Sequence, residues 1–226
     1  MQHRNWLSFF FVFMLALCTK DGRTAAQQNL GDLVNNNTVG LISAGIEGTY
    51  VKIASDLSKA LDNKYNFRVV PIIGKGSKKN IEDLLYLEGV DLAIVQSDVL
   101  DFYGRDPEHK FPDIDEKVFY ITKLYNEEVH LIARRDITSI GDLAGMKVSY
   151  GPEGGGSALT AENIFDVLGV RADFVEYHYV DALKELRQGN IQALIHVAGK
   201  KVKDYETIPP EDGLHLLSLP EQSFDS

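Results

Sequence analysis

The sequence predicts an α/β fold built as two similar lobes, each a mainly parallel sheet flanked by helices. The order strand, glycine-containing turn, helix recurs along the chain, and this order is typical of parallel sheets with right-handed crossovers. It pauses after Tyr103 and begins again at Lys147. Between the two copies, residues 118–133 are rich in β-branched and aromatic side chains, which suits an extended crossing from one lobe to the other.

The first lobe is predicted from three strands and the helices that follow them. We expect strands at residues 38–44, 67–73 and 91–95, and a short helical piece near 98–103. Apolar residues at three- and four-residue intervals predict the two intervening helices. They are Tyr50, Ile53, Ala54, Leu57 and Leu61 in the first helix, and Ile81, Leu84 and Leu85 in the second.

The second lobe repeats this plan. We expect strands at residues 147–150, 173–176 and 192–197, with helices between them. The first of these helices has one apolar face and a stop signal at Gly169, and the second runs over residues 181–188 and ends at Gly189. The apolar face consists of Ala161, Ile164, Phe165 and Leu168.

Size and composition narrow the class of protein. The chain has 226 residues, of which 44% are hydrophobic, so it can bury the core of one large domain or two small ones. Its net charge of −10 argues against a nucleic-acid partner. Cys18 is its one cysteine, which excludes disulfides and cysteine-metal sites.

Residues 1–26 have the layout of a signal peptide. A polar start with Arg4 precedes an apolar run of about a dozen residues, which is shorter than the roughly 20 that span a membrane, and Ala26 ends a stretch of small residues. We therefore expect cleavage after Ala26 and a periplasmic location. A lipid anchor at Cys18 is the alternative, but Leu17 stands where lipoprotein signals have a small residue.

Two glycine-rich loops are candidate binding elements. They span residues 45–50 and 154–160, and each stands between a predicted strand and a helix. Open parallel sheets bind ligands outside the carboxyl ends of their strands, and a helix N-terminus favours an anion. Two such edges that face each other would form a cleft. The alternative interpretation is that each loop is an ordinary glycine turn before a helix, with no role in binding.

Polar side chains near these loops complete the candidate site. Gln96 and Ser97 follow the third strand and could orient a polar ligand, although Ser97 could instead cap a helix. Tyr50 could cover an apolar part of the ligand or join the core. Ser157 and Thr160 add hydroxyl donors in the second lobe.

Signatures of catalysis are weak. Ser157 lacks the following glycine of a nucleophile elbow, and residues 74–79 do not match a phosphate-binding loop. The acidic cluster at 113–116 is expected to form a solvated loop. We therefore predict no catalytic residue, no cofactor, no metal and no enzyme. The histidines show no metal-ligand spacing: His109, His130, His178, His196 and His215.

Four segments resemble one known family, the TAXI-type solute-binding proteins of tripartite ATP-independent periplasmic (TRAP) transporters. Together they cover nearly all of the chain after residue 26, in the family's order. The segments are GIEGTYVKIASDLSKAL (45–61), GSKKNIEDLLYLEGVDLAIVQSDVL (76–100), LYNEEVHLIARRDITSIGDLAGMKVSYGPEGGGSALTAENIFDVLGV (124–170) and ALKELRQGNIQALIHVAGKKV (182–202).

The resemblance implies a type II periplasmic-binding-protein fold that closes on a small carboxylate or amino acid, such as glutamate or glutamine. It also implies a partner, the membrane permease of an ion-gradient-driven TRAP transporter. The matching ligand positions are Gly48, Thr49, Tyr50, Gln96, Ser97, Gly155, Ser157 and Thr160. The alternative is a periplasmic ligand-sensing protein that signals to a membrane kinase or another partner.

The sequence departs from the family at two places. Glu47 stands where many relatives have a glycine or a neutral polar residue, and its carboxylate would repel an anion. The relatives also continue beyond the last residues of this chain, so we expect the second lobe and the return to the first lobe to be incomplete. The expected organisation is a signal peptide at 1–26, lobe 1 at 27–123, an inter-lobe hinge at 124–135 and a truncated lobe 2 at 136–226.

Overall fold

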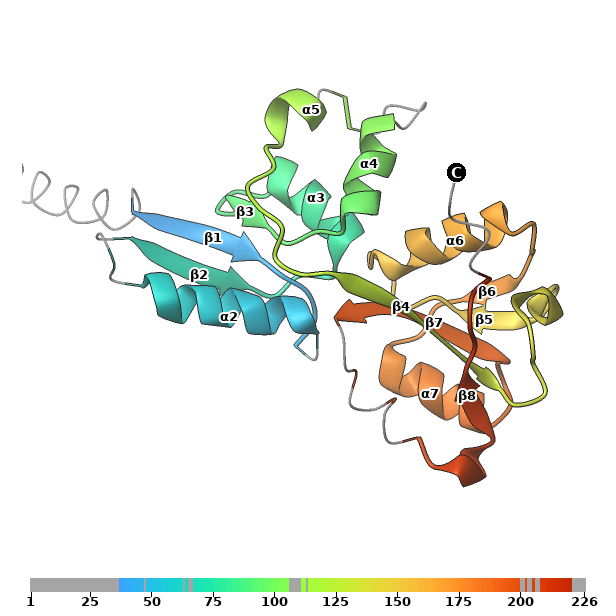
Figure 1. The fold of residues 1–226 in the computed structure, drawn as a ribbon. Helices are drawn as coiled ribbons and strands as arrows, with labels where there is room; N and C mark the ends of the chain where they lie inside the picture. The colour runs from blue at the N-terminus through green and yellow to red at the C-terminus, as the bar shows by residue number, and fades with distance from the viewer. Residues whose placement is uncertain are drawn as a thin grey trace, which may run out of the picture.

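The structure is a computed structural model that describes residues 37–46, 48–62, 64, 67–105, 111–112, 114–199, 202, 205 and 208–220. Two sheets form two lobes side by side, and one stretch of chain that ends in strand β4 connects them (Figure 1). The predicted signal peptide with Cys18, and also Glu47, His109 and Asp113, lie outside the described residues. Within the described part, every helix falls short of the length and apolar character needed to cross a bilayer.

Lobe 1 contains the predicted parallel sheet. Its strands are β1 (Thr38–Ile42), β2 (Arg68–Ile72) and β3 (Leu92–Ala93), in the order β2-β1-β3, and β1 is parallel to both neighbours. Helix α2 (Thr49–Leu61) covers one face of the sheet. Helices α3 (Ser77–Tyr86), α4 (Ser97–Arg105) and α5 (Ile114–Lys117) lie on the other side (Figure 1).

Apolar periodicity explains how α2 packs. Tyr50 and Ala54, four residues apart, are buried against Leu41, Val69 and Ile94 of the sheet region. Residues at this spacing lie on the same side of a helix, so the predicted face of α2 is the face that meets the sheet. The predicted end of this face is wrong in one respect, because Leu61 is 36% exposed in the last turn.

Lobe 2 contains a mixed sheet in the order β6-β5-β7-β4-β8. Its strands are β4 (Glu127–Arg134), β5 (Lys147–Ser149), β6 (Asp173–Val175), β7 (Ala193–Gly199) and β8 (Leu214–Leu216). Strand β5 is parallel to β6 and β7, whereas β4 is antiparallel to β7 and β8. Helices α6 (Ser157–Val167) and α7 (Tyr179–Arg187) cover opposite faces (Figure 1), and the 3-10 helices are η1 (Ile140–Leu143) and η2 (Pro210–Asp212).

Alternation along the central strands explains why both faces of this sheet are covered. Leu131 and Ile195 belong to the apolar cluster of α6, whereas their chain neighbours Ile132 and Leu194 belong to that of α7. Successive side chains of a strand point to opposite faces. Because apolar residues occupy both positions, each face needs a helix to bury it.

Glycines end α6 and α7 at the predicted residues. Gly169 and Gly189 have φ values of +67° and +78°, a conformation that glycine adopts without a steric penalty. After α6, the Gly169 N–H bonds the Asp166 carbonyl and the next N–H bonds that of Phe165, and α7 ends with the same pair of bonds. This is the Schellman arrangement, which satisfies the last carbonyls of each helix.

The crossing region differs from the prediction. Only its second half forms a strand, β4, which is a central strand of the lobe-2 sheet. Residues 118–126 form no strand, and Phe119, Tyr120 and Ile121 are 79%, 74% and 72% exposed. Their composition favours a strand, but no neighbouring strand is available to them within the described residues. The boundaries of the hinge and of the two lobes remain predictions.

A second difference concerns the acidic cluster after residue 112. Asp115 and Glu116 lie in the short helix α5 and not in a loop, and both are exposed as expected. Ile114, at the start of α5, is buried in the cluster of α3 and α4. This anchor was not identified from the sequence, and it explains why the segment is ordered as a helix.

Candidate functional site

Three helix N-termini carry glycine at the N-cap position. They are Gly48 before α2, Gly76 before α3 and Gly156 before α6, and none has a side-chain cap. Each of these helices follows a strand of a parallel pair, so its N-terminus lies at the carboxyl edge of its sheet. The first N–H groups of these helices therefore have no N-cap side chain to satisfy them, which is the arrangement that favours an anionic group.

Tyr50 forms a polar cluster with residues of α3 and β4. Its hydroxyl donates to Glu127 Oε2 at 3.2 Å and lies 3.3 Å from Ser77 Oγ. The Tyr125 hydroxyl donates to the other carboxylate oxygen, Glu127 Oε1, at 2.8 Å, and its ring packs edge-on against that of Tyr50. The Thr49 hydroxyl bonds the Tyr125 phenol. The start of α2 is thus connected to the strand that enters lobe 2.

Gln96 connects this cluster to lobe 2. Its backbone N–H donates to Ser77 Oγ at 2.9 Å, and its amide Nε2 donates to Thr160 Oγ1 of α6 at 3.3 Å. The Thr160 hydroxyl donates to Asp98 Oδ2 of α4 at 2.5 Å. Two polar residues of lobe 1 therefore bond one hydroxyl of lobe 2.

The glycine loop of lobe 2 lies directly against lobe 1. The Lys79 N–H donates to the Gly154 carbonyl at 3.2 Å, and a Cβ atom on Gly76 would lie 2.9 Å from the Cα atom of Gly155. A Cβ atom on Gly156 would lie 1.5 Å from Gln96 Oε1. The absence of side chains at these glycines allows the two lobes to approach this closely.

On the lobe-2 side, Ser157 organises a second polar group. Its Oγ accepts the Val197 N–H at 3.1 Å and lies 2.9 Å from the Tyr179 hydroxyl. The Tyr179 ring stacks on His196, with 3.4 Å between the ring centroids, and His196 Nδ1 lies 2.6 Å from the Tyr205 hydroxyl. Strand β7 and the first residues of α6 and α7 therefore contribute to one polar group.

Glu127 affects the pKa values of tyrosines in both the Tyr50 cluster and the Ser157 group. Burial raises the pKa of Glu127, the phenol hydrogens of Tyr125 and Tyr50 lower it in part, and the charge of Asp98 raises it further. Burial is the largest cause that raises the pKa of Tyr50 and of Tyr125, and the negative charge of Glu127 is the second. Burial raises the pKa of Tyr179 to about 12, against the hydrogen bond of Ser157, and Glu127 adds to the shift. All three phenols therefore remain hydrogen-bond donors at neutral pH.

Most of the eight residues that the resemblance points to lie at this contact between the lobes. Tyr50, Gln96 and Thr160 belong to the inter-lobe network, Thr49 adjoins it, and Gly48 and Gly155 lie in the two loops. Ser157 belongs to the lobe-2 group. Ser97 is different: it is exposed and begins α4 as its first residue. Whether these residues bind a ligand remains a prediction.

The sequence reading missed several residues of the site, among them Asp98, which accepts the hydroxyl hydrogen of Thr160. Ser77 and Glu127 were not identified, although the first follows a glycine turn before a helix and the second lies in the polar interruption of the crossing. Those two patterns could have indicated them. Tyr125 and Tyr179 reach the site through tertiary contacts alone, so no local signal indicates them.

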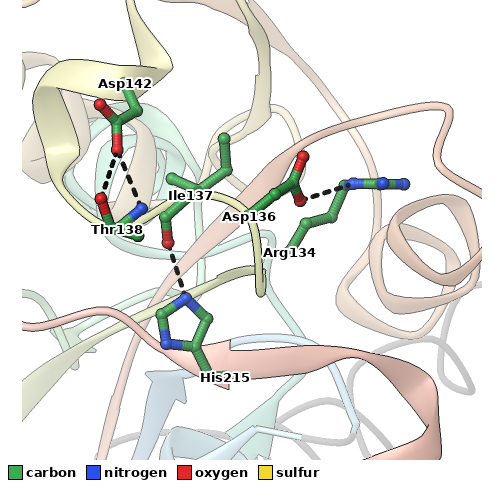
Figure 2. A network of polar contacts seen from close by, with 6 residues as sticks. All are labelled: Arg134, Asp136, Ile137, Thr138, Asp142 and His215. Carbon is green, nitrogen blue, oxygen red and sulfur yellow. Dashed lines mark hydrogen bonds and ion pairs between the residues drawn. The ribbon is translucent and has the colours of Figure 1, made fainter.

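An open cavity of about 700 Å³ lies elsewhere, at the amino ends of β5 and β6, and therefore at the edge of lobe 2 away from the glycine loops. Arg134 Nε donates to Asp136 Oδ1 at 3.2 Å in its wall, as Figure 2 shows. Nearby, His215 Nε2 meets the Ile137 carbonyl at 2.8 Å. Arg134 and Asp136 already pair with each other at solvent-exposed positions, so this cavity is a weaker candidate than the contact between the lobes.

A metal centre finds no support in the described residues. No group of three or more His, Cys, Asp or Glu side chains among them could hold a metal ion. What the inter-lobe contact offers instead is a set of hydroxyl, amide and carboxylate groups beside three helix N-termini. Such groups orient a polar molecule by hydrogen bonds and charge.

The fold is similar to those of solved binding proteins. An ancestral arginine-binding protein bound to arginine matches with a TM-score of 0.54 and 16% identity, over 80% of this chain and 78% of that chain. The effector-binding domain of QuiR in complex with shikimate matches with a TM-score of 0.54 and 14% identity, over 81% of each chain. A cysteine-binding protein from Campylobacter jejuni matches with a TM-score of 0.52 and 15% identity, over 83% of this chain and 73% of that chain.

At these identities the likeness establishes the fold, which is the predicted α/β fold of type II periplasmic binding proteins. A family model, that of the NMT1-like family, matches residues 41–226, which is most of the chain. The prediction that the protein is not an enzyme agrees with this assignment to a binding-protein fold. The chain therefore belongs to the NMT1-like family and has the fold of type II periplasmic binding proteins.

Proposed function

We propose that this protein is an extracytoplasmic solute receptor whose two lobes close on a small carboxylate or amino acid. The observation that carries the proposal is the bond between Gln96 and Thr160, which joins a candidate ligand residue of lobe 1 to one in the candidate loop of lobe 2. A molecule bound here would contact both lobes at once. Such a molecule stabilises the closed form because its contacts are complete only in that form.

The ligand would replace the bonds that the lobes now make with each other. Its carboxylate would accept N–H groups at the start of α2 or α6, because Gly48 and Gly156 provide no side chain that caps these groups. Hydroxyl and amide groups would fix its orientation. We place the ligand contacts at Gly48, Thr49, Tyr50, Gln96, Ser97, Gly155, Ser157 and Thr160.

The partner we propose is the permease of a TRAP-type transporter, which would receive the ligand from the closed form. The family resemblance of the sequence supports this, as does the binding-protein fold. Export to the periplasm belongs to the same proposal. Two of the matched structures are an arginine-binding protein bound to arginine and a cysteine-binding protein, which is compatible with an amino-acid ligand here.

A thermal-shift screen of amino acids and small carboxylates tests the proposal. A ligand at a hundred times its Kd stabilises the folded state by about 2.7 kcal/mol, which raises Tm by about 5 °C or more in a protein of this size. We expect such a shift, with the ligand recovered chemically unchanged. Thr160→Val removes a hydroxyl that bonds both Gln96 and Asp98, and should reduce the shift.

Thr122→Val is the matched control, because Thr122 is exposed and bonds only the carbonyl of its neighbour, Lys123, among the described residues. It should leave the shift unchanged. A folded protein that no compound of the screen stabilises would contradict the proposal. Conversion of a ligand by the purified protein would also contradict it.

A further inference from the structure

Glu127 is a partly buried carboxylate at the centre of the inter-lobe contact. Each of its oxygens accepts one phenol hydrogen, Oε2 from Tyr50 and Oε1 from Tyr125. A carboxylate oxygen can accept more than one hydrogen bond. Glu127 therefore keeps acceptor capacity on both oxygens after its two tyrosines are counted.

No cationic side chain compensates the Glu127 charge within the described residues. None of the ion pairs among them includes Glu127 or Asp98, and no Lys, Arg or His contributes to the pKa of Glu127. Lys79, at the loop that meets lobe 2, already pairs with Glu82 at 3.1 Å and Asp83 at 3.0 Å. A desolvated carboxylate without a cation is costly, and phenol donors compensate it only in part.

Asp98 makes this region more negative. It accepts the hydroxyl hydrogen of Thr160 across the contact, and its charge acts on both Glu127 and Tyr50. The charge of Glu127 in turn reaches Tyr179 on the lobe-2 side. Any molecule held between the lobes therefore lies in the field of two carboxylates.

We propose that the ligand carries a positively charged nitrogen that pairs with the Glu127 carboxylate when the lobes close. An ammonium group has three donors, so it can bond Glu127 and still bond hydroxyl groups nearby. A hydrogen bond between two charged groups is stronger than one between neutral groups. This inference rests on the proposed function and narrows it to amine-bearing ligands, such as amino acids, over carboxylates without an amine.

The glycine-capped helix ends and Glu127 then have complementary roles. A helix N-terminus stabilises the negative end of an amino acid, and Glu127 stabilises its positive end. A dicarboxylate without an amine would bring a second negative charge towards Glu127 and be repelled. The fold itself does not decide whether the ligand carries an amine, because the fold is shared with an arginine-bound protein and with a shikimate-bound domain.

Isothermal titration calorimetry with matched ligand pairs tests the inference on the full chain. The pairs differ only at the amine: L-glutamate with 2-oxoglutarate, L-alanine with pyruvate, L-leucine with 4-methyl-2-oxopentanoate, and L-phenylalanine with phenylpyruvate. We expect at least one amino acid to bind, with its 2-oxo acid bound at least tenfold more weakly. A 2-oxo acid that binds as tightly as its amino acid, or more tightly, overturns the inference and leaves the proposed function intact.

Glu127→Gln provides the second arm. It keeps the shape and removes the charge, but one of the two oxygens that accept the phenols becomes an amide NH₂ group, which only donates. The decisive readout is therefore the preference for the amino acid over its 2-oxo acid, which should fall to about twofold or less, while affinity for the amino acid should fall at least tenfold. The control is Glu128→Gln, since Glu128 is the next residue of β4 and is exposed. It should change affinity less than twofold.

Unchanged affinity in a folded Glu127→Gln variant overturns the inference. If that variant fails to fold, Glu127→Asp, which keeps the charge, and the ligand pairs on the unaltered protein still decide it. Failure of every compound to bind overturns the proposed ligand class itself, and with it this inference.

Discussion

His196 is a histidine that the fold keeps neutral. Its ring is stacked on Tyr179, and its Nδ1 lies 2.6 Å from the Tyr205 hydroxyl. Burial lowers the pKa of His196 to about 3, and the neighbouring His130, opposite it in the β4–β7 ladder, contributes by charge repulsion. The ordinary histidine pKa is about 6.5, so the folded protein excludes a proton that the unfolded chain binds.

This difference predicts a pH dependence of stability. Between pH 6.5 and pH 3 the unfolded state binds one more proton at this residue, so stability falls as the pH falls, by up to about 1.4 kcal/mol per pH unit. His196→Gln removes this contribution. Between pH 7 and pH 5 the free energy of unfolding of the variant should therefore fall by about 2 kcal/mol less than that of the unaltered protein.

Urea unfolding at the two pH values measures this effect. His178→Gln is the control, because His178 is exposed at the N-terminus of α7. The control should show the same pH dependence as the unaltered protein. Equal pH dependence in all three proteins would show that the protonation of His196 is not coupled to folding.

Helix α6 belongs to lobe 2 but packs on both lobes. Ala161, Ile164 and Phe165 lie in the lobe-2 core, as the apolar spacing predicted. Leu159, by contrast, is buried in the lobe-1 cluster with Ile81 of α3. One helix thus contributes apolar side chains to two cores, and the polar contact of Thr160 lies beside an apolar one.

This packing predicts that Leu159→Ala destabilises the protein through the contact between the lobes. Leu159 is only 4% exposed, and replacing a buried leucine by alanine typically costs about 2–5 kcal/mol. We expect a loss of unfolding free energy in that range by urea denaturation. Val167→Ala is the control on the same helix, because Val167 is 64% exposed, and should cost less than about 0.5 kcal/mol. Equal losses in the two variants would contradict the inter-lobe role of Leu159.

The elements themselves were largely predictable from the sequence, because each has a local signal. Apolar spacing and glycine stop signals give α6 and α7, and alternating strand and helix patterns give the parallel pairs. The antiparallel position of β4 was not predictable in the same way. Its pairing with β7 joins residues 60 to 72 positions apart, and no turn between the two strands indicates it.

The site was predictable only in part, because some of its residues have a local sequence signal and others do not. Loops with glycine before a helix are visible in the sequence, and they lie at the contact between the lobes. The polar interruption of the crossing indicates Glu127 only weakly, because its importance comes from burial and from the absence of a compensating cation among the described residues. Ser97, next to Gln96 in the sequence, is exposed at the start of α4, and its role as a ligand contact remains a prediction.

At the scale of the whole molecule, an opening of the lobes has to break the polar bonds between them and withdraw Leu159 from the lobe-1 cluster. The chain joins them through residues 118–126, which form no strand (Figure 1). The polar part of the contact consists of single hydrogen bonds, such as those from Lys79 to Gly154 and from Gln96 to Thr160. A bond of this kind contributes about 1 kcal/mol, so the loss of a few should shift the balance towards open forms.

Distances between spin labels test this opening. With Cys18 replaced by serine, Lys59→Cys on α2 and Glu162→Cys on α6 place one label on each lobe at exposed positions. Thr160→Val removes the hydroxyl bonds across the contact, so we expect a longer and broader distance distribution between these labels. The control pair, Glu162→Cys and Lys184→Cys, lies within lobe 2 and should not change. An unchanged inter-lobe distance, or an equal change in both pairs, would contradict a hinged opening, because the hydroxyl of Thr160 would then not hold the lobes together.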